Sequence, residues 1–193
     1  MAIAVGSLVP RALAEAEVID PAGATHRLDA TWRDRDVVLV FVRHFACAGC
    51  AEHLAALRPR LDELARLAVD VVIVGNGSPD QLAAFVERKD VARPHVRSFT
   101  DPTLAAYRAA GLVRSRWGTL GPIALGQVVR AYLNGHRNGR PQGDLYQQGG
   151  TLYVTKAGAV AFYQRATSLG DHASLGDVVD IALAQRAGEA AIA

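Results

Sequence analysis

The sequence predicts an α/β fold in which helices flank a mixed, mostly parallel central sheet. Three observations support this fold class. The unbroken apolar run at 37–42 and the mostly apolar run at 69–75, which contains Asp70, have the β-branched content of buried strands. Between them, apolar residues over 54–68 follow the spacing of one helix face. Strand and helix patterns then continue to alternate along the chain, as they do in layered α/β proteins.

Before the first apolar run, we expect a small hairpin within 15–33. Asp20-Pro21-Ala22-Gly23 has the residue types of a tight turn, since proline presets φ and glycine accepts a positive φ. The helix that follows the first run contains Pro59, which should kink it rather than end it because the apolar stripe resumes in phase.

Two further helices are predicted by a capping residue followed by proline, at Ser78-Pro79 and Asp101-Pro102. A short strand at 95–99 separates them, and Gly111 closes the second. Near the end of the chain, 151–155 and 159–163 are expected to pair as a hairpin that supplies antiparallel edge strands. A last helix should run from Ser174 to about Ala187, with a frayed tail over 188–193.

A basic insertion at 112–149 interrupts the alternation. It carries five arginines and a single acid, Asp144, and the pattern after Gly121-Pro122 predicts one amphipathic helix. One interpretation is a surface insertion with a solvated basic face. The other is a cover that shapes the access route to the cysteines.

Composition indicates one domain over 1–193, because half of the 193 residues are hydrophobic and 21% are charged. A net charge of +2 is too small to indicate a nucleic-acid partner. The chain shows no apolar run near the ~20 residues of a spanning helix, and its start lacks a signal-peptide pattern. We therefore expect a soluble, cytoplasmic protein with no membrane partner.

Cys47-Ala48-Gly49-Cys50 contains the only two cysteines and lies between the first buried strand and a helix. The unpaired N–H groups at a helix start favour negative charge, which lowers a thiol pKa and populates the reactive thiolate. In a reducing cytosol such a pair is more typical of catalysis or metal binding than of a structural disulfide.

The order of these elements around the cysteine pair resembles the thioredoxin fold. Four further segments make the resemblance more specific: Arg43-His44-Phe45, Gln142-Gly143-Asp144, Gln148-Gly149-Gly150 and Gly170-Asp171-His172. With these segments, residues 8 to 185 resemble more closely the peroxiredoxin-like AhpC/TSA (thiol-specific antioxidant) family.

The resemblance implies a thiol-dependent oxidoreductase, either an antioxidant peroxidase or a disulfide reductase, with a thioredoxin-like fold. The catalytic residues would be Cys47 and Cys50, cycling between dithiol and disulfide. The substrate would be a hydroperoxide or a disulfide, and thioredoxin or a low-molecular-weight thiol would be the reductant. No cofactor is implied, and relatives of this kind often form homodimers.

The chain departs from both parent patterns. The peroxiredoxin motif Pro-x-x-x-Thr-x-x-Cys aligns with Arg43, Cys47 and Cys50, which puts the peroxide-attacking position on Cys50. Thioredoxins instead use the first cysteine, and we favour Cys47 as the attacking thiol because it lies at the helix start. The arginine that peroxiredoxins place before the strand at Thr151 is replaced, with Gln148 as its expected occupant.

Three residues are expected to support the thiols. Arg43 would hold a thiolate by charge, and His44 would take or return a proton near neutral pH. Strand alternation sends these two to opposite faces, so His44 is equally a candidate for a packing residue. Arg165 is a candidate replacement for the missing arginine. Alternatively, Arg165 and Asp171-His172 form a salt-bridged loop that caps the last helix.

Two other functions fit parts of the sequence. His44, Cys47, Cys50 and His53 have the composition of a zinc site, but a strand end and one helix face would have to converge, so we expect no metal. The second is a redox-sensing or interaction module, in which the cysteines report oxidation and the insertion docks a partner.

Overall fold

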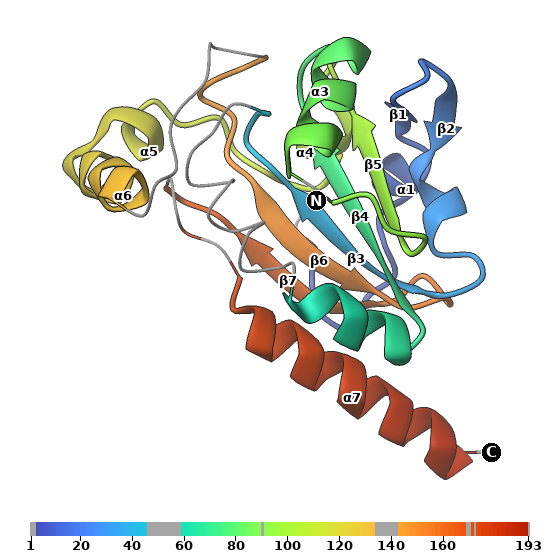
Figure 1. Cartoon of the computed structure of the whole chain (residues 1–193). Helices are drawn as coiled ribbons and strands as arrows, with labels where there is room; N and C mark the ends of the chain where they lie inside the picture. Colours follow the sequence, from blue (N-terminus) through green and yellow to red (C-terminus); the bar gives the residue numbers. More distant parts are fainter. Residues whose placement is uncertain are drawn as a thin grey trace.

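A computed structural model describes residues 3–45, 59–89, 91–133, 143–168, 171 and 173–192 of the chain (Figure 1). Its seven-stranded mixed sheet has the order β2-β1-β5-β4-β3-β6-β7. The predicted α/β class is therefore confirmed. The strands are β1 (Glu17–Ile19), β2 (Thr25–Arg27), β3 (Asp36–Phe41), β4 (Val69–Gly75), β5 (Val96–Thr100), β6 (Gly150–Val154) and β7 (Val160–Arg165).

Strand β3 lies in the interior of this sheet, and all six of its residues are buried. It pairs in parallel with β4, and β4 pairs in parallel with β5. On its other side β3 pairs antiparallel with β6, with Phe41 opposite Gly150. The closing hairpin was expected to supply edge strands, which is correct for β7 only. Because β6 fills the free edge of β3, it is an interior strand.

The predicted N-terminal hairpin is present as β1 and β2. The Asp20 carboxylate accepts the backbone N–H groups of Ala22 and Ala24, both at 2.9 Å, which fixes the turn between the strands. Strand β1 then joins the main sheet through a single pair, Ile19 opposite Thr100 of β5. The hairpin therefore forms the sheet edge opposite to β7.

The helices cover both faces of the sheet. They are α1 (Arg11–Ala14), the 3₁₀ turn η1 (Leu28–Thr31), the helical residues 59–66, α3 (Pro79–Lys89), α4 (Ala105–Ala109), α5 (Trp117–Leu120), α6 (Pro122–Leu133) and α7 (Leu175–Ile192). Alternation along β3 sends Val38 and Val40 toward α3, α7 and the helical residues 59–66. Val37 and Leu39 face α1 and α4. The start of the helix that contains Pro59 lies outside the described residues.

Two helix boundaries differ from the prediction, and one agrees in detail. At α3, the Ser78 hydroxyl accepts the Gln81 N–H while the Gln81 side chain accepts the Ser78 N–H, which is a capping box. Helix α4 begins at Ala105, later than expected, because Leu104 has a φ of 59°. The tail expected to fray is instead helical as far as Ile192, so that prediction is wrong.

In the described residues of the basic insertion, the helix predicted after Gly121-Pro122 is present as α6, and a four-residue helix that was not expected, α5, precedes it. Helices α5 and α6 project together from one side of the sheet in Figure 1, away from α7. In the part of the chain that the structure describes, no helix combines the length and the apolar character needed to cross a membrane.

Candidate active site around Arg43

The candidate site lies where the chain leaves the carboxyl end of β3. Val42 continues the ladder by one bond to the Val74 carbonyl, and the buried Tyr107 hydroxyl lies 2.6 Å from the Val42 carbonyl and 3.0 Å from that of Val74. Arg43 and His44 follow directly. Cys47, Cys50, His53 and His172 are outside the described residues, so the two catalytic candidates remain predictions.

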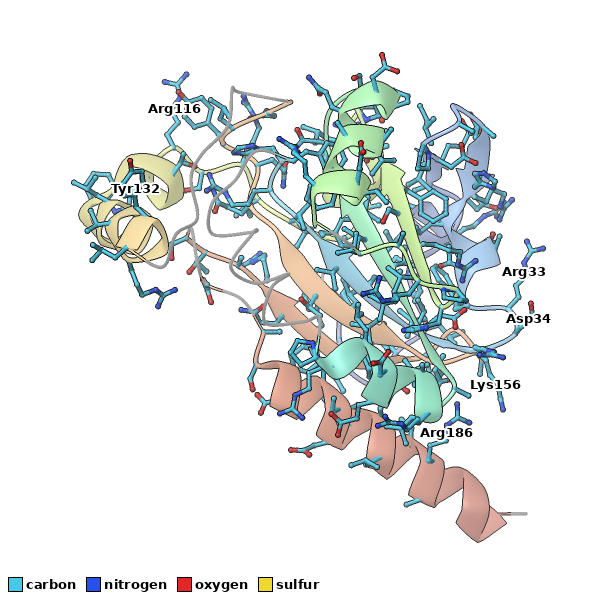
Figure 2. The ribbon with its side chains drawn as sticks, viewed as in Figure 1. Arg33, Asp34, Arg116, Tyr132, Lys156 and Arg186 are labelled. Atoms are coloured by element: carbon cyan, nitrogen blue, oxygen red, sulfur yellow. The ribbon has the colours of Figure 1, made fainter. Side chains whose placement is uncertain are left out.

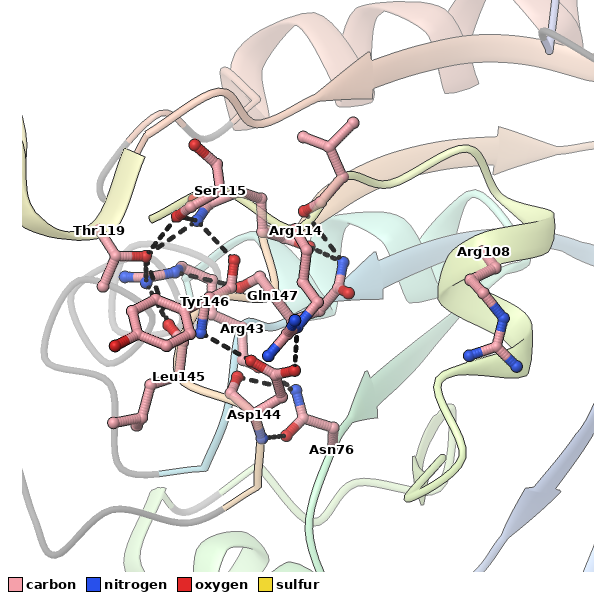
Figure 3. Close-up of polar contacts among 12 residues, drawn as sticks. Arg43, Asn76, Arg108, Arg114, Ser115, Thr119, Asp144, Leu145, Tyr146 and Gln147 are labelled. Atoms are coloured by element: carbon pink, nitrogen blue, oxygen red, sulfur yellow. Dashed lines mark hydrogen bonds and ion pairs between the residues drawn. The ribbon is translucent and has the colours of Figure 1, made fainter. Parts of the chain in front are cut away.

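Arg43 is buried, and the insertion holds its guanidinium group (Figure 3). Its Nη2 donates to the Thr119 hydroxyl and to the Leu145 carbonyl, each at 2.7 Å, and its Nε donates to the Gln147 carbonyl at 3.3 Å. Hydrogen bonds from a charged donor are about twice as strong as neutral ones. The insertion therefore builds the surroundings of Arg43 and is more than a solvated surface feature.

A second set of contacts joins the backbone of Arg43 to the segment that contains Asp144 (Figure 3). Buried Asn76 follows β4; its amide donates to the Arg43 carbonyl and its Oδ1 accepts the Asp144 N–H at 2.6 Å. The Asp144 carboxylate accepts the Arg114 guanidinium and, at 2.8 Å, the Tyr146 N–H. Burial raises the pKa of Asp144, but these donors outweigh it and hold the pKa below its usual value.

His44 is buried beside two charged groups. Burial lowers its pKa from 6.5 to about 4, with the positive charge of Arg43 adding to this effect and the negative charge of Asp144 opposing it. His44 is therefore neutral at pH 7. The expectation that strand alternation sends Arg43 and His44 to opposite faces does not apply, because β3 ends at Phe41, before both residues. Both side chains are buried.

The depressed pKa of His44 predicts a loss of stability in mild acid. Between pH 6.5 and pH 4 the unfolded chain binds a proton at His44 that the folded chain does not, so the free energy of unfolding falls as pH falls. A shift to about 4 corresponds to about 3 kcal/mol over this interval. Urea denaturation at several pH values measures the effect. In His44→Gln the free energy of unfolding should depend less on pH over this interval. The same pH dependence in both proteins would contradict the low pKa of His44.

Gln148, the expected occupant of the peroxiredoxin arginine position, is completely buried beside Arg43. Its Nε2 donates to the Thr119 hydroxyl at 3.1 Å, to the Ser115 carbonyl at 3.2 Å and to the Tyr146 carbonyl at 3.0 Å. Its Oε1 is buried and accepts no hydrogen bond from any of the described residues. Thr119 thus joins Gln148 to Arg43 through one hydroxyl group.

Arg165 lies at the same end of the sheet but apart from this network. It ends β7 opposite Gly150, which in turn lies opposite Phe41. Its side chain is exposed. The Asp171 carboxylate accepts Gln164 Nε2 at 2.9 Å and the backbone N–H and hydroxyl of Thr167, so it closes the loop after β7 through amide and hydroxyl groups.

Two residues of the network had not been expected from the sequence. Asn76 had a usable signal, because it directly follows a buried parallel strand, where functional side chains gather. Thr119 had none, since a threonine within a basic segment does not indicate which distant arginine it contacts. Among the described residues no cluster of three metal-ligating side chains occurs, and of the four zinc-like candidates only His44 is described.

Comparison with known proteins identifies the family. Residues 54–168 match the model of the AhpC/TSA antioxidant enzyme family, which is more than half of the 193-residue chain. The chain belongs to the AhpC/TSA antioxidant enzyme family. This confirms the peroxiredoxin-like resemblance and makes the protein a thiol-dependent oxidoreductase of the peroxidase type. The matched residues begin after Cys50, so the roles of the two cysteines belong to the proposal below.

Two curated relatives and one solved structure are similar to this chain. "Thioredoxin-like protein AAED1, chloroplastic" from Arabidopsis thaliana is 31% identical over 63% of this chain and 48% of that protein, so the chain spans about half the length of that relative. "Prostamide/prostaglandin F synthase" from Salmo salar is 31% identical over 86% of each chain. Peroxidoxin BcpB from Mycobacterium tuberculosis shares the fold, with a TM-score of 0.67, 17% identity and coverage of 93% and 96%.

Proposed function

We propose that this protein is a thiol peroxidase that reduces hydroperoxides through Cys47 and Cys50. The observation that carries the proposal is the buried Arg43, held rigidly four residues before Cys47 by Thr119 and two backbone carbonyls. A fixed cation close to a thiol favours its thiolate form. Family membership supplies the reaction class.

The proposed cycle has three steps. A thiolate attacks the distal peroxide oxygen, the O–O bond breaks, and the alcohol leaves after taking up one proton, so that sulfenic acid forms. The second thiol then displaces hydroxide from the sulfenic sulfur, giving a disulfide and one water molecule. A thioredoxin-type protein or a low-molecular-weight thiol returns two electrons and two protons by thiol–disulfide exchange. We propose Cys47 as the attacking residue and Cys50 as the resolving one.

Stopped-flow kinetics of the reduced full-length protein tests this cycle. Hydrogen peroxide or an organic hydroperoxide should consume two thiols per chain in a second-order reaction, and reduced thioredoxin should restore both. Faster reaction with oxidised thioredoxin than with either peroxide would instead identify a disulfide reductase. Oxidation of the thiols without turnover by any reductant would identify a redox sensor and would overturn the proposal.

Thr119 offers a test of the role of Arg43. Thr119→Val removes the hydroxyl that Arg43 and Gln148 share, so Arg43 is held less firmly and the thiolate loses part of its stabilisation. We expect the peroxide rate at neutral pH to fall about tenfold. The midpoint of the pH–rate profile should also move upward, which a purely structural defect would not cause.

Matched variants separate positioning from general damage. Thr119→Ser keeps the hydroxyl and should restore both the rate and the pH midpoint. Thr25→Val makes the same change at an exposed position of β2 and should leave both unchanged. An unshifted profile in Thr119→Val would show that Arg43 does not act on the thiol through this contact.

A further inference from the structure

Helix α6 carries an apolar stripe that faces solvent. Leu125, Val129, Tyr132 and Leu133 are spaced as i, i+4, i+7 and i+8, which places them on one side of the helix. Their side chains are between 51% and 81% exposed. An amphipathic helix normally turns such a stripe toward its own protein core, so this arrangement is typical of a helix that contacts something else.

Helix α5 extends the same exposed surface. Trp117 is 77% exposed and follows Arg116 directly. Figures 1 and 2 show α5 and α6 together as a projection at the opposite side of the molecule from the β1–β2 hairpin, with Arg116 and Tyr132 at its outer boundary. We call this surface the α5–α6 patch; it comprises Trp117, Leu125, Val129, Tyr132 and Leu133, together with Arg116 and Arg130.

The charge around this patch has one sign. Residues 112–133, which include α5 and α6, contain no acidic residue and three arginines, Arg114, Arg116 and Arg130. The Asp144 carboxylate is itself bound by Arg114. The surroundings of the patch are therefore cationic, and they complement an anionic partner.

We propose that the α5–α6 patch binds the surface of an anionic lipid bilayer. Exposed tryptophan and tyrosine prefer the boundary between lipid and water, and arginines beside an apolar stripe are attracted to anionic headgroups. A two-fold contact with a second copy fits less well, because it would bring two arginine-rich surfaces together. The absence of a membrane partner was expected because the sequence has no membrane-spanning segment, whereas the proposed contact lies on the surface of the bilayer. It is independent of the peroxidase proposal.

Sedimentation of the full-length protein with vesicles tests the proposal. The wild type should bind vesicles of phosphatidylcholine with phosphatidylglycerol, but bind pure phosphatidylcholine at least about tenfold more weakly, and added salt should reduce the binding. Leu125→Glu with Val129→Glu should lower the affinity for anionic vesicles at least about tenfold. Trp117 fluorescence should shift to shorter wavelength on binding, against a constant signal from buried Trp32.

Leu183→Glu is the matched control, because Leu183 is 48% exposed on α7 and lies outside the patch. It should bind vesicles like the wild type, and all variants should keep the wild-type thermal unfolding midpoint. The absence of wild-type binding to anionic vesicles at low salt would overturn the proposal. So would a self-association, measured by ultracentrifugation, that the Leu125 and Val129 substitutions abolish while vesicle binding stays unchanged, since the occupant would then be a second copy.

Discussion

Replacing Cys47 with serine is expected to lower the rate of peroxide reduction at least about a thousandfold, because a hydroxyl group at this position cannot supply a thiolate. Replacing Cys50 should have a different effect. The first reaction with peroxide would proceed, but without the second thiol the sulfenic acid would persist and turnover would stop. Rapid-mixing kinetics and the mass of the oxidised protein, with one added oxygen atom in Cys50→Ser, measure both effects.

The two mutants also decide which cysteine attacks. The ungapped comparison with the peroxiredoxin motif assigns attack to Cys50, whereas the helix-start argument assigns it to Cys47. If Cys50 attacks, the two results exchange: Cys50→Ser becomes inert and Cys47→Ser accumulates the sulfenic acid. Full peroxide reduction in both single mutants would contradict a thiol mechanism at this site altogether.

Replacing Gly143 with alanine is expected to lower the free energy of unfolding by about 2–5 kcal/mol. Gly143 has a φ of 70°, which alanine rarely adopts, and a Cβ placed there would lie 2.6 Å from the Asn76 backbone carbonyl oxygen and closer still to its side-chain oxygen. The substitution should therefore separate the Asp144 loop from Asn76. Urea denaturation measures the loss.

Gly143→Ala should also affect peroxide reduction, because the loop that contains Asp144 contacts Arg43. Asn76 also donates to the Arg43 carbonyl, and Leu145 accepts from the Arg43 side chain, so displacement of the loop loosens Arg43 at both points. Peroxide reduction should fall together with stability. Gly126→Ala is the control: among the described residues, no atom beyond the neighbouring residues and backbone of its own helix lies within 4 Å of the added Cβ. Within helix α6 alanine should be neutral or stabilising by about 1 kcal/mol. Equal stability of the two variants would contradict this account.

The sequence was sufficient for elements whose signal is local. The apolar runs identified β3 and β4, and Ser78-Pro79 identified the start of α3, because each depends on neighbouring residues alone. The interior place of β6 could not be predicted, since a hairpin pattern does not say which of its strands joins the rest of the sheet. The continuation of α7 to Ile192 was missed because the tail has no strong stop or core-facing pattern.

The candidate site could likewise be predicted only in part from the sequence. Arg43 was singled out because it lies at the strand end, four residues before Cys47, but its partners come from far along the chain. The Arg43 bond to Leu145 joins residues 102 positions apart, and it ends on a backbone carbonyl, which every residue possesses. No residue type indicates such a contact. The depressed pKa of His44 likewise depends on burial by distant segments and was not foreseen.

The pairing of β3 with β6 has a consequence for how the chain is made. The Tyr153 hydroxyl donates to Asp36 at 2.8 Å across 117 positions, so β3 has one open edge until most of the chain has left the ribosome. Closing so long a loop costs entropy before its contacts form, which slows folding. During synthesis β3 and β4 therefore exist as an incomplete apolar sheet. This interval is the one in which a chaperone, or low temperature during expression, would raise the yield of native protein.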